Sequence, residues 1–378
     1  MITVLLDKAE FEYDIHSLVK AFYPKEEVYV STKDKEKKEE PVHYHMDVQF
    51  APEEIIFSWK RVEASEDNAN QTGITKCVAV DDTNRKETKN SLKRTLYRLL
   101  SEYTGVELPW GNLTGIRPTK IPMALLEEGK SEEEIARYMK ETYFTSDEKI
   151  KLSIEIAERE LELLHKLDYE EGYSLYIGIP FCPTTCLYCS FTSYSMSAWK
   201  NRMDDYLSAL EKELDYTAVK FAHKKLNSIY IGGGTPTTLN PKQLDRLIRK
   251  IKCSFDLSDL VEFTVEAGRP DSITKEKLMV LRNHDISRIS INPQTMKQET
   301  LDLIGRHHTV QQTIDSFYLA RELGFDNINM DLIVGLPGES LSDVADTMEV
   351  IRKLAPDNLT VHSLAIKRAA RLNIQRER

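Results

Sequence analysis

From residue 174 onward, short apolar segments alternate with amphipathic helical segments, and this alternation limits the possible folds more than any other feature of the sequence. The apolar segments are 174–179, 228–233, 261–267, 286–292, 327–334 and 358–366. The amphipathic segments between them are 203–221, 241–252, 274–284, 313–324 and 342–354. Repeated strand–helix units require a parallel sheet with right-handed crossovers. Because six strands are fewer than the eight of a closed barrel, we predict an α/β fold with an open, partial (β/α)6 barrel.

The part of the chain that precedes the barrel is predicted to contain a small α/β (α+β) domain. Its expected strands and helix are 2–7, 28–32, 45–50, 54–59 and 89–103. Two helical stretches follow, and the second has apolar residues at helical spacing: Ile150, Ile154, Ala157, Leu161 and Leu164. We therefore predict an N-terminal domain over 1–105, a helical connector over 106–172 and the barrel over 173–378.

Composition and charge exclude several classes of protein. The 378 residues are 41% hydrophobic and 30% charged, as is typical of soluble globular proteins. The start, MITVLLDKAEFEYD, turns acidic early, and no later segment has the apolar length that a membrane span requires. The net charge of -10 disfavours broad contact with a nucleic-acid backbone. We expect a cytoplasmic protein with no membrane span and no nucleic-acid partner.

Three of the five cysteines, Cys182, Cys186 and Cys189, lie close together directly after the first barrel strand. Active sites of parallel α/β folds gather at the carboxyl ends of the strands. Structural zinc requires four ligands, and the other two cysteines lie elsewhere: Cys77 in the N-terminal domain and Cys253 on a barrel helix, where a lone cysteine is expected to be buried. Three thiolates suit a four-iron cluster that leaves one iron open to a small molecule.

Other motifs follow the remaining strands: GGGTPT, EAGRP, NPQ and GLPGE. The glycine run is not followed by GKS or GKT, so we do not expect a nucleotide P-loop. The carboxylate of Glu266 would complement a positively charged ligand. Gln294 and Asp331 are polar residues at strand ends, which favours a functional role. Arg306 lies beyond its strand, and a surface ion pair is the alternative for it.

Together these motifs resemble those of the radical S-adenosylmethionine (SAM) superfamily, whose signature CxxxCxxC corresponds here to CPTTCLYC. Within it, GIPFCP, RISINPQ, IGRHHT and MDLIVGLPGE are similar to the oxygen-independent coproporphyrinogen III oxidase (dehydrogenase) group. The segments WGNLTGIRPTK, VEAGRPD and LTVHSLAIKRA are similar to the HemZ-type branch of that group. The resemblance covers nearly the whole chain.

The resemblance implies a [4Fe-4S] cluster held by Cys182, Cys186 and Cys189, with SAM chelating the open iron. It also implies a second SAM. The positions that match SAM contacts of the family are Tyr176, Tyr188, Gly233, Gly234, Thr235, Glu266, Gln294, Arg306, Asp331 and Ala365. For Tyr188, aromatic packing beside the cluster is the alternative.

The activity that the resemblance implies is oxidative decarboxylation of coproporphyrinogen III, by way of a 5'-deoxyadenosyl radical. Two propionates would become vinyl groups, giving protoporphyrinogen IX for haem biosynthesis, with electrons from a flavodoxin or ferredoxin. The alternatives are a haem-binding chaperone of the same superfamily and another radical SAM reaction such as methyl transfer. Candidate partners for the carboxylates of this tetrapyrrole substrate are basic, with surface solvation as the alternative for each: Arg269, Arg306, Arg368, Arg117 and Lys120.

Two departures from the family pattern affect these expectations. Gly178 stands where the better-known oxidases carry a histidine, which fits the HemZ type. The family continues into a C-terminal domain that covers the open side of the barrel, and we expect that domain to be absent from this shortened chain. The cluster and SAM ligands would remain, whereas the shelter of the substrate from water would be reduced.

Overall fold

The computed structural model describes residues 1–32, 42–62, 73–80, 83–115, 117–367 and 370–376. The chain divides into two units, Met1–Leu164 and His165–Arg378, and each is described by itself. This division falls within the predicted connector; the three predicted domain boundaries remain a prediction. Among the described residues, no helix combines the length and the apolar character needed to cross a membrane.

The first unit contains a mixed five-stranded sheet with the order β2-β1-β3-β4-β5. Its strands are β1 (Ile2–Leu6), β2 (Val28–Thr32), β3 (Tyr44–Phe50), β4 (Glu54–Arg61) and β5 (Ile74–Ala79). The strand β1 pairs in parallel with β2 and β3, whereas β3, β4 and β5 are antiparallel. The strand β5 was not predicted from the sequence. Its segment ITKCVA is an edge strand whose residues are only half-buried or exposed, so it lacks a clear apolar pattern.

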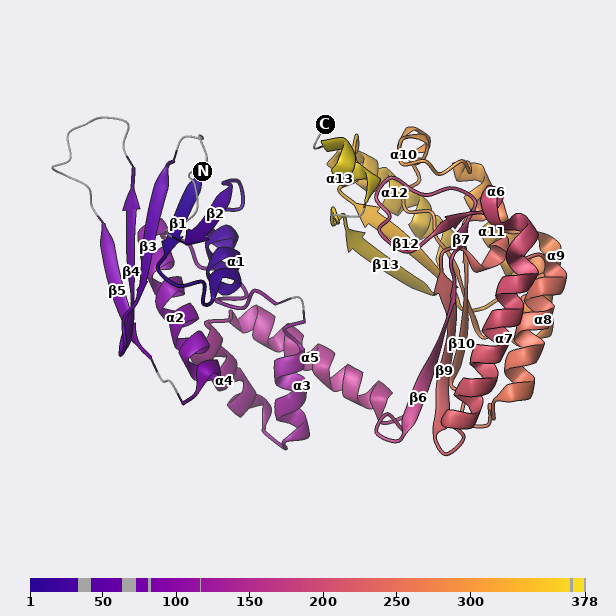
Figure 1. The fold of residues 1–378 in the computed structure, drawn as a ribbon, viewed down its shortest axis with the longest axis horizontal. Helices are drawn as coiled ribbons and strands as arrows, with labels where there is room; N and C mark the ends of the chain where they lie inside the picture. The colour runs from indigo at the N-terminus through magenta and orange to yellow at the C-terminus, as the bar shows by residue number, and fades with distance from the viewer. Residues whose placement is uncertain (33–41, 63–72, 81–82, 116, 368–369, 377–378) are drawn as a thin grey trace. The chain divides into compact units, whose positions relative to one another are not determined.

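Two helices of the first unit, α1 (Glu12–Phe22) and α2 (Arg85–Thr104), pack against this sheet through one apolar core (Figure 1). The expected helix 89–103 lies within α2, whereas α1 was not predicted. Three further helices follow, α3 (Lys120–Glu127), α4 (Glu132–Tyr143) and α5 (Asp147–Leu164), with a small apolar core of their own. The second predicted helical stretch corresponds to α5, whereas the part before it contains two helices, because α3 ends at Glu127 and α4 begins at Glu132.

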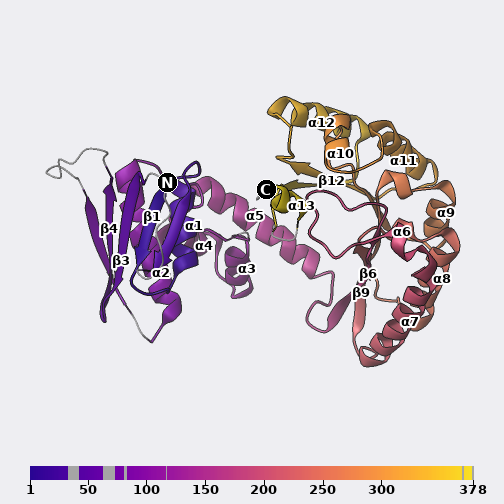
Figure 2. The ribbon, with the colours of Figure 1, turned by 45° about the horizontal axis from the view of Figure 1, so that its top comes forward.

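The second unit contains a curled, wholly parallel sheet with the strand order β13-β12-β11-β10-β9-β6. The strands are β6 (Gly172–Ile179), β9 (Lys225–Gly233), β10 (Glu262–Gly268), β11 (Arg288–Ile291), β12 (Ile328–Val334) and β13 (Asn358–Ser363). The outermost strands β6 and β13 are not paired with each other in the described sheet, so the barrel is open, as Figures 1 and 2 show. The predicted α/β fold with a partial barrel is confirmed.

The two faces of this sheet differ in chemistry. The outer face carries apolar residues such as Ile231, Val265 and Leu332, which pack against the covering helices. These helices are α7 (Met203–Lys220), α8 (Pro241–Ser254), α9 (Lys275–Asn283), α11 (Val310–Glu322) and α12 (Leu341–Leu354). Because side chains alternate along a strand, the intervening residues face the inside of the barrel. Many of these are polar, among them Tyr230 and Glu266, which are hydrogen-bonded to each other.

Shorter elements complete the loops at the carboxyl ends of the strands. They are β7 (Phe181–Cys182), β8 (Tyr194–Ser195), α6 (Met196–Trp199), α10 (Gln298–Leu303) and α13 (Arg371–Arg376). Asn240 and Gln243 form a capping box at the start of α8, with Pro241 as its first residue, as the sequence suggests. These local signals fix where the helix begins after the glycine run.

Candidate functional site

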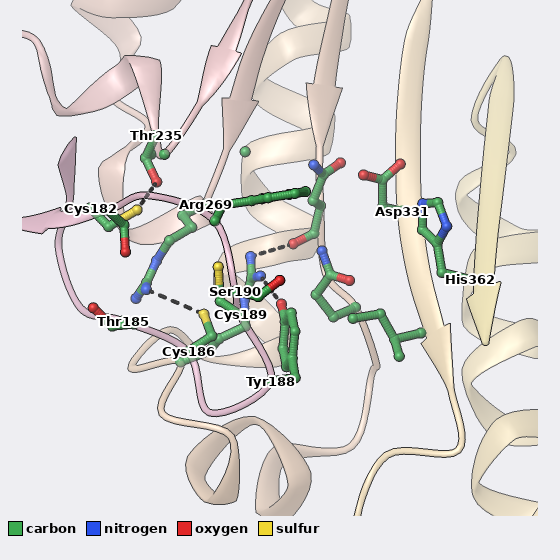
Figure 3. A pocket seen from close by; sticks show the side chains of 18 of the residues that line it. Cys182, Thr185, Cys186, Tyr188, Cys189, Ser190, Thr235, Arg269, Asp331 and His362 are labelled. Carbon is green, nitrogen blue, oxygen red and sulfur yellow. Dashed lines mark hydrogen bonds between the residues drawn. The ribbon is translucent and has the colours of Figure 1, made fainter. Parts of the chain in front are cut away.

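A cavity of about 360 Å³ lies at the carboxyl end of the parallel sheet and is lined by residues at the strand ends and in the loops that follow them (Figure 3). Every predicted site residue except Tyr176 lines it: Cys182, Cys186, Tyr188, Cys189, Gly233, Gly234, Thr235, Glu266, Gln294, Arg306, Asp331 and Ala365. These residues span nearly half of the sequence, and the parallel topology brings them to one place. Their roles as ligands of a cluster or of SAM remain proposals.

The three cysteines lie on a loop that is fixed to a neighbouring part of the barrel. Thr184 Oγ1 donates to the carbonyl of Gly305 (2.9 Å), and Leu187 N donates to the carbonyl of Ile304 (2.9 Å). Leu187 is also part of a small apolar cluster with Ile304. The loop is therefore anchored by its non-cysteine residues, while the sulfur atoms face the cavity (Figure 3).

Two of the three sulfur atoms accept hydrogen bonds from side chains. Thr235 Oγ1 donates to Cys182 Sγ (3.6 Å), and Arg269 Nη1 donates to Cys186 Sγ (3.9 Å). Burial raises the pKa of the Cys182 and Cys189 thiols. A bound iron would counteract this effect, because a coordinating thiol is deprotonated by the metal charge. The thiols and their donors fit an iron–sulfur cluster, whose sulfur ligands normally carry such hydrogen bonds.

Gly234, in the glycine run after β9, lies against the segment that leads into the cysteine loop. Its N–H donates to the carbonyl of Ile179 (2.8 Å), and Thr235 N donates to the carbonyl of Phe181 (2.7 Å). A Cβ atom at position 234 would lie 2.7 Å from the oxygen of Phe181 and 2.9 Å from that of Ile179. The absence of a side chain therefore lets the two strand ends approach, one residue before Cys182.

A tyrosine that the sequence analysis missed, Tyr230, holds the carboxylate of Glu266. Its hydroxyl donates to Glu266 Oε1 (2.5 Å), and its ring stacks on Tyr176 with centroids 5.9 Å apart. Tyr176 is exposed inside the open barrel and does not line the cavity itself. Gly232 leaves room for this pair, since a Cβ there would lie 2.6 Å from Tyr230 Cε1. The sequence held one sign of this contact. Side chains alternate along a strand, so positions 230 and 232 face the same side of the sheet.

Burial raises the pKa of the Glu266 carboxyl group, and the hydrogen bond from Tyr230 acts in the opposite direction. The negative charge of Asp331, two strands away in the sheet, raises the pKa of Glu266 further. Two carboxyl groups thus line one cavity in a partly desolvated setting, which favours a ligand that carries positive charge.

Gln294 follows β11 in a left-handed backbone conformation with φ of +70°. Its N–H donates to the carbonyl of Asp331 (2.9 Å), and its carbonyl accepts from Ile333 N (2.9 Å). The side chain of Asp331 is oriented by Asn329 Nδ2, which donates to its Oδ1 (2.8 Å). A non-glycine residue in this region costs conformational free energy, and such strain is found preferentially at functional sites.

Arg306 is 3% exposed, so the alternative of a surface ion pair was wrong. Its Nη1 donates to Tyr188 Oη (3.1 Å) and its Nη2 to the carbonyl of Asn292 (2.6 Å). Two buried polar atoms at the cavity, Arg306 Nε and Asn292 Oδ1, have no hydrogen-bond partner in the described part of the protein. Buried polar groups are normally paired, so these two atoms fit a site that receives a polar ligand.

The other basic residues that were expected to bind substrate carboxylates differ in their exposure and in their contacts. Arg269 is 4% exposed and donates to Asp271 and to the cysteine loop, which corrects the expectation of surface solvation. Arg117 and Lys120 are exposed and belong to the first unit. Arg368 lies outside the described residues.

Neither of the two remaining cysteines is among the residues that line this cavity. Cys77 is exposed on β5 of the first unit, and Cys253 is exposed on α8. The expectation that Cys253 is buried was wrong, because its position falls on the outer side of an amphipathic helix whose apolar residues, such as Leu244 and Ile248, take up the buried side. Both cysteines serve as matched controls for the three at the cavity.

Part of the chain matches a known protein family, and the chain is similar in sequence to several known proteins. Residues 176–351 match the Radical SAM superfamily. The oxygen-independent coproporphyrinogen-III oxidase-like protein HemZ of Bacillus subtilis is 44% identical over 312 residues, which are 80% of this chain and 62% of that protein. The heme chaperone HemW of Bacillus subtilis is 40% identical over 198 residues, which are 51% of each chain.

The oxygen-independent coproporphyrinogen III oxidase of Escherichia coli is 33% identical over 196 residues, which are 52% of this chain and 42% of that protein. The chain thus spans less than two thirds of the length of each of these relatives. The family match begins within β6, includes the loop that carries the three thiols and the strands β9 to β12, and ends before β13. Residues 176–351 therefore form a domain of the Radical SAM superfamily, and the chain is similar in sequence to HemZ, HemW and the oxygen-independent coproporphyrinogen III oxidases.

Proposed function

We propose that this chain catalyses the SAM-dependent, oxygen-independent oxidative decarboxylation of coproporphyrinogen III propionates to vinyl groups. The observation that supports it is the cavity in which three thiols, two carboxyl groups and the polar atoms Asn292 Oδ1 and Arg306 Nε meet, two atoms that have no hydrogen-bond partner among the described residues. The likeness to the oxidase-like protein HemZ extends beyond the barrel into the first unit, since it covers 80% of the chain. When bound, a [4Fe-4S] cluster and SAM supply the removal of a hydrogen atom from an unactivated C–H bond.

In this proposal Cys182, Cys186 and Cys189 hold the cluster, and the remaining residues bind and orient SAM. Glu266, aligned by Tyr230, would accept hydrogen bonds from the ammonium group of SAM, because a carboxylate complements its positive charge. The polar side chains that would bind further SAM groups, including a second SAM, are Thr235, Gln294, Arg306 and Asp331. The electron donor in the proposal is a small one-electron carrier such as a flavodoxin or a ferredoxin.

A second candidate function is haem binding and transfer. It is supported by the identity of 40% to the heme chaperone HemW, compared with 33% to the oxidase of Escherichia coli over a region of similar length. The two candidates share the barrel and the thiols, so the cavity by itself does not favour either one. They differ in what the protein does with a tetrapyrrole.

One experiment separates these functions. The full chain is reconstituted anaerobically with iron and sulfide, supplied with SAM and a reductant, and incubated with coproporphyrinogen III. Formation of 5'-deoxyadenosine together with vinyl-bearing product is the expected result. Stoichiometric haem binding, with no deoxyadenosine formed in response to coproporphyrinogen, would instead support the chaperone, and a methylated product would support methyl transfer.

The Tyr230→Phe substitution is expected to weaken SAM binding about tenfold, because a hydrogen bond to a charged group contributes roughly 1.5–3 kcal/mol. Binding should also depend on pH. Since the pKa of Glu266 is raised, its carboxylate is lost as the pH falls through that raised value, and SAM binding weakens with it. Without Tyr230 this pKa rises further, so the loss of binding should begin at a higher pH than in the wild type.

The measurement is the dissociation constant of SAM on the reconstituted protein, determined by calorimetry across the acidic and neutral range. Tyr173→Phe is the matched control, since Tyr173 lies in the first part of β6 and packs against Phe221. An unchanged pH profile in Tyr230→Phe would contradict the role given to the Tyr230–Glu266 pair.

A further inference from the structure

Arg269, which follows β10, is a buried cation with one edge fixed by a carboxylate. It is 4% exposed, its Nε donates to Asp271 Oδ1 (3.0 Å) and its Nη2 donates to Asp271 Oδ2 (2.7 Å). This two-pronged pairing fixes the plane of the guanidinium group. The other edge of that plane is thereby directed at the cysteine loop (Figure 3).

At that edge a single nitrogen, Arg269 Nη1, contacts three acceptors of the loop. It donates to the carbonyl of Thr184 (3.1 Å), to Thr184 Oγ1 (2.8 Å) and to Cys186 Sγ (3.9 Å). Thr184 Oγ1 in turn donates to the carbonyl of Gly305 (2.9 Å). Arg269 therefore both fixes the loop and places a positive charge beside one of the three sulfur atoms.

These contacts argue against a role for Arg269 in binding substrate carboxylates. Nε and both terminal nitrogens of the guanidinium group already donate to protein acceptors. A propionate would have to displace Asp271 or Thr184 from the guanidinium group, and would lose hydrogen bonds that the buried Arg269 already makes. The positive charge of Arg269 lies beside Cys186 Sγ and instead suits an electrostatic effect on that sulfur atom.

The reduction potential of an iron–sulfur cluster depends on hydrogen bonds to its sulfur ligands and on nearby charge. Reduction adds negative charge to the cluster, so a cation and a donor at Cys186 stabilise the reduced form. The effect is large where the cation is buried, because charges interact more strongly away from water. Asp271 carries the opposite charge on the far side of the guanidinium group and opposes part of this effect.

We propose that Arg269 is a positioning residue that raises the reduction potential of the cluster through Cys186, and that Asp271 limits the size of this increase. The inference rests on the part of the proposed function that assigns a cluster to the three cysteines. Its consequence is that a more weakly reducing electron carrier can reduce this cluster than could reduce one without the Arg269–Cys186 contact.

The test is a potentiometric titration of the reconstituted full chain, followed by the electron paramagnetic resonance signal of the reduced cluster. We expect a more negative midpoint potential in Arg269→Gln and a more positive one in Asp271→Asn. In Arg269→Lys, which keeps the charge and loses the two-pronged pairing, we expect a value between those of Arg269→Gln and the wild type. Loss of loop structure would shift the midpoint potentials of Arg269→Gln and Asp271→Asn in the same direction. Shifts of opposite sign therefore distinguish an electrostatic effect on the cluster from damage to the loop.

Arg288→Gln is the matched control, because Arg288 lies on the neighbouring strand β11 and pairs with Glu262 (3.5 Å). Its midpoint potential should equal that of the wild type. Potentials in Arg269→Gln and Asp271→Asn that equal the wild type, or that shift in the same direction at equal iron content, would overturn the inference. If Arg269→Gln loses its cluster, a potential in Asp271→Asn that is not above the wild type overturns it.

This design separates two kinds of failure. A wild-type chain that binds no cluster after reconstitution refutes the cluster assignment, and with it both the proposed function and this inference. A wild-type chain that binds a cluster whose potential does not respond to the substitutions refutes the inference alone.

Discussion

Replacement of Cys186 by alanine is expected to abolish the iron-dependent visible absorbance of the reconstituted protein and all SAM cleavage. Cys186 is buried at the cavity wall and is the sulfur that Arg269 contacts. A cluster with three protein ligands that loses one of them is left with too few thiolates to be held against chelation. Iron content should therefore fall from about four atoms per chain, the number in a four-iron cluster, to near zero.

The measurements are iron analysis, the absorbance spectrum and 5'-deoxyadenosine formation, with far-ultraviolet circular dichroism to show that the barrel persists. Cys182→Ala and Cys189→Ala should behave in the same way. Cys253→Ala and Cys77→Ala are the controls, because both thiols are exposed and neither lines the cavity, and they should retain the cluster. A Cys186→Ala protein with wild-type iron content would refute the assignment of ligands.

Replacement of Gly234 by alanine should lower the rate of SAM cleavage by about a hundredfold. The added Cβ would lie within 3.0 Å of three backbone atoms: Phe181 O, Ile179 O and Phe181 N. Backbone atoms do not move aside as a flexible side chain does, so the segment before Cys182 must shift. A displacement of about 1 Å at a reacting centre can cost that factor in rate.

The same substitution should lower the free energy of unfolding by about 1–3 kcal/mol, as is usual when a closely packed site is overfilled. The rate of 5'-deoxyadenosine formation and the iron content are measured together. Gly115→Ala is the control, because no described atom lies within 4 Å of a Cβ built there. A Gly234→Ala protein with wild-type turnover would show that the contact between the two strand ends is not needed.

The strands and helices of the barrel were largely predictable, because each is encoded by a local pattern. The apolar segment 228–233 corresponds to β9, and the cap Asn240 with Pro241 marks the start of α8. The sequence was less informative where the pattern is weak. The edge strand β5 has no buried face, and α3 is a short helix of 8 residues in which Pro122 is the buried residue.

The cysteine motif and the polar residues at the strand ends also identified most of the cavity in advance. The expected positions of Gln294 and Asp331 were sufficient to place them there, since the carboxyl ends of parallel strands share one edge. The motifs did not predict that the arginine side chains at the cavity are buried. A surface ion pair was the alternative for Arg306 and surface solvation the alternative for Arg269, yet both side chains are buried, and neighbouring loops supply their acceptors.

The sequence by itself determined the parallel α/β architecture, the three thiols and the end of the sheet at which they lie, because periodicity and motif spacing are local properties of the chain. Only the tertiary structure decided which side chains meet, as it did for Tyr230 with Glu266 and for Arg269 with Cys186. Such contacts join residues that are 36 and 83 positions apart in the chain. They depend on strand register, on which face of the sheet each residue occupies and on how the loops fold over the strand ends, and no local pattern records these.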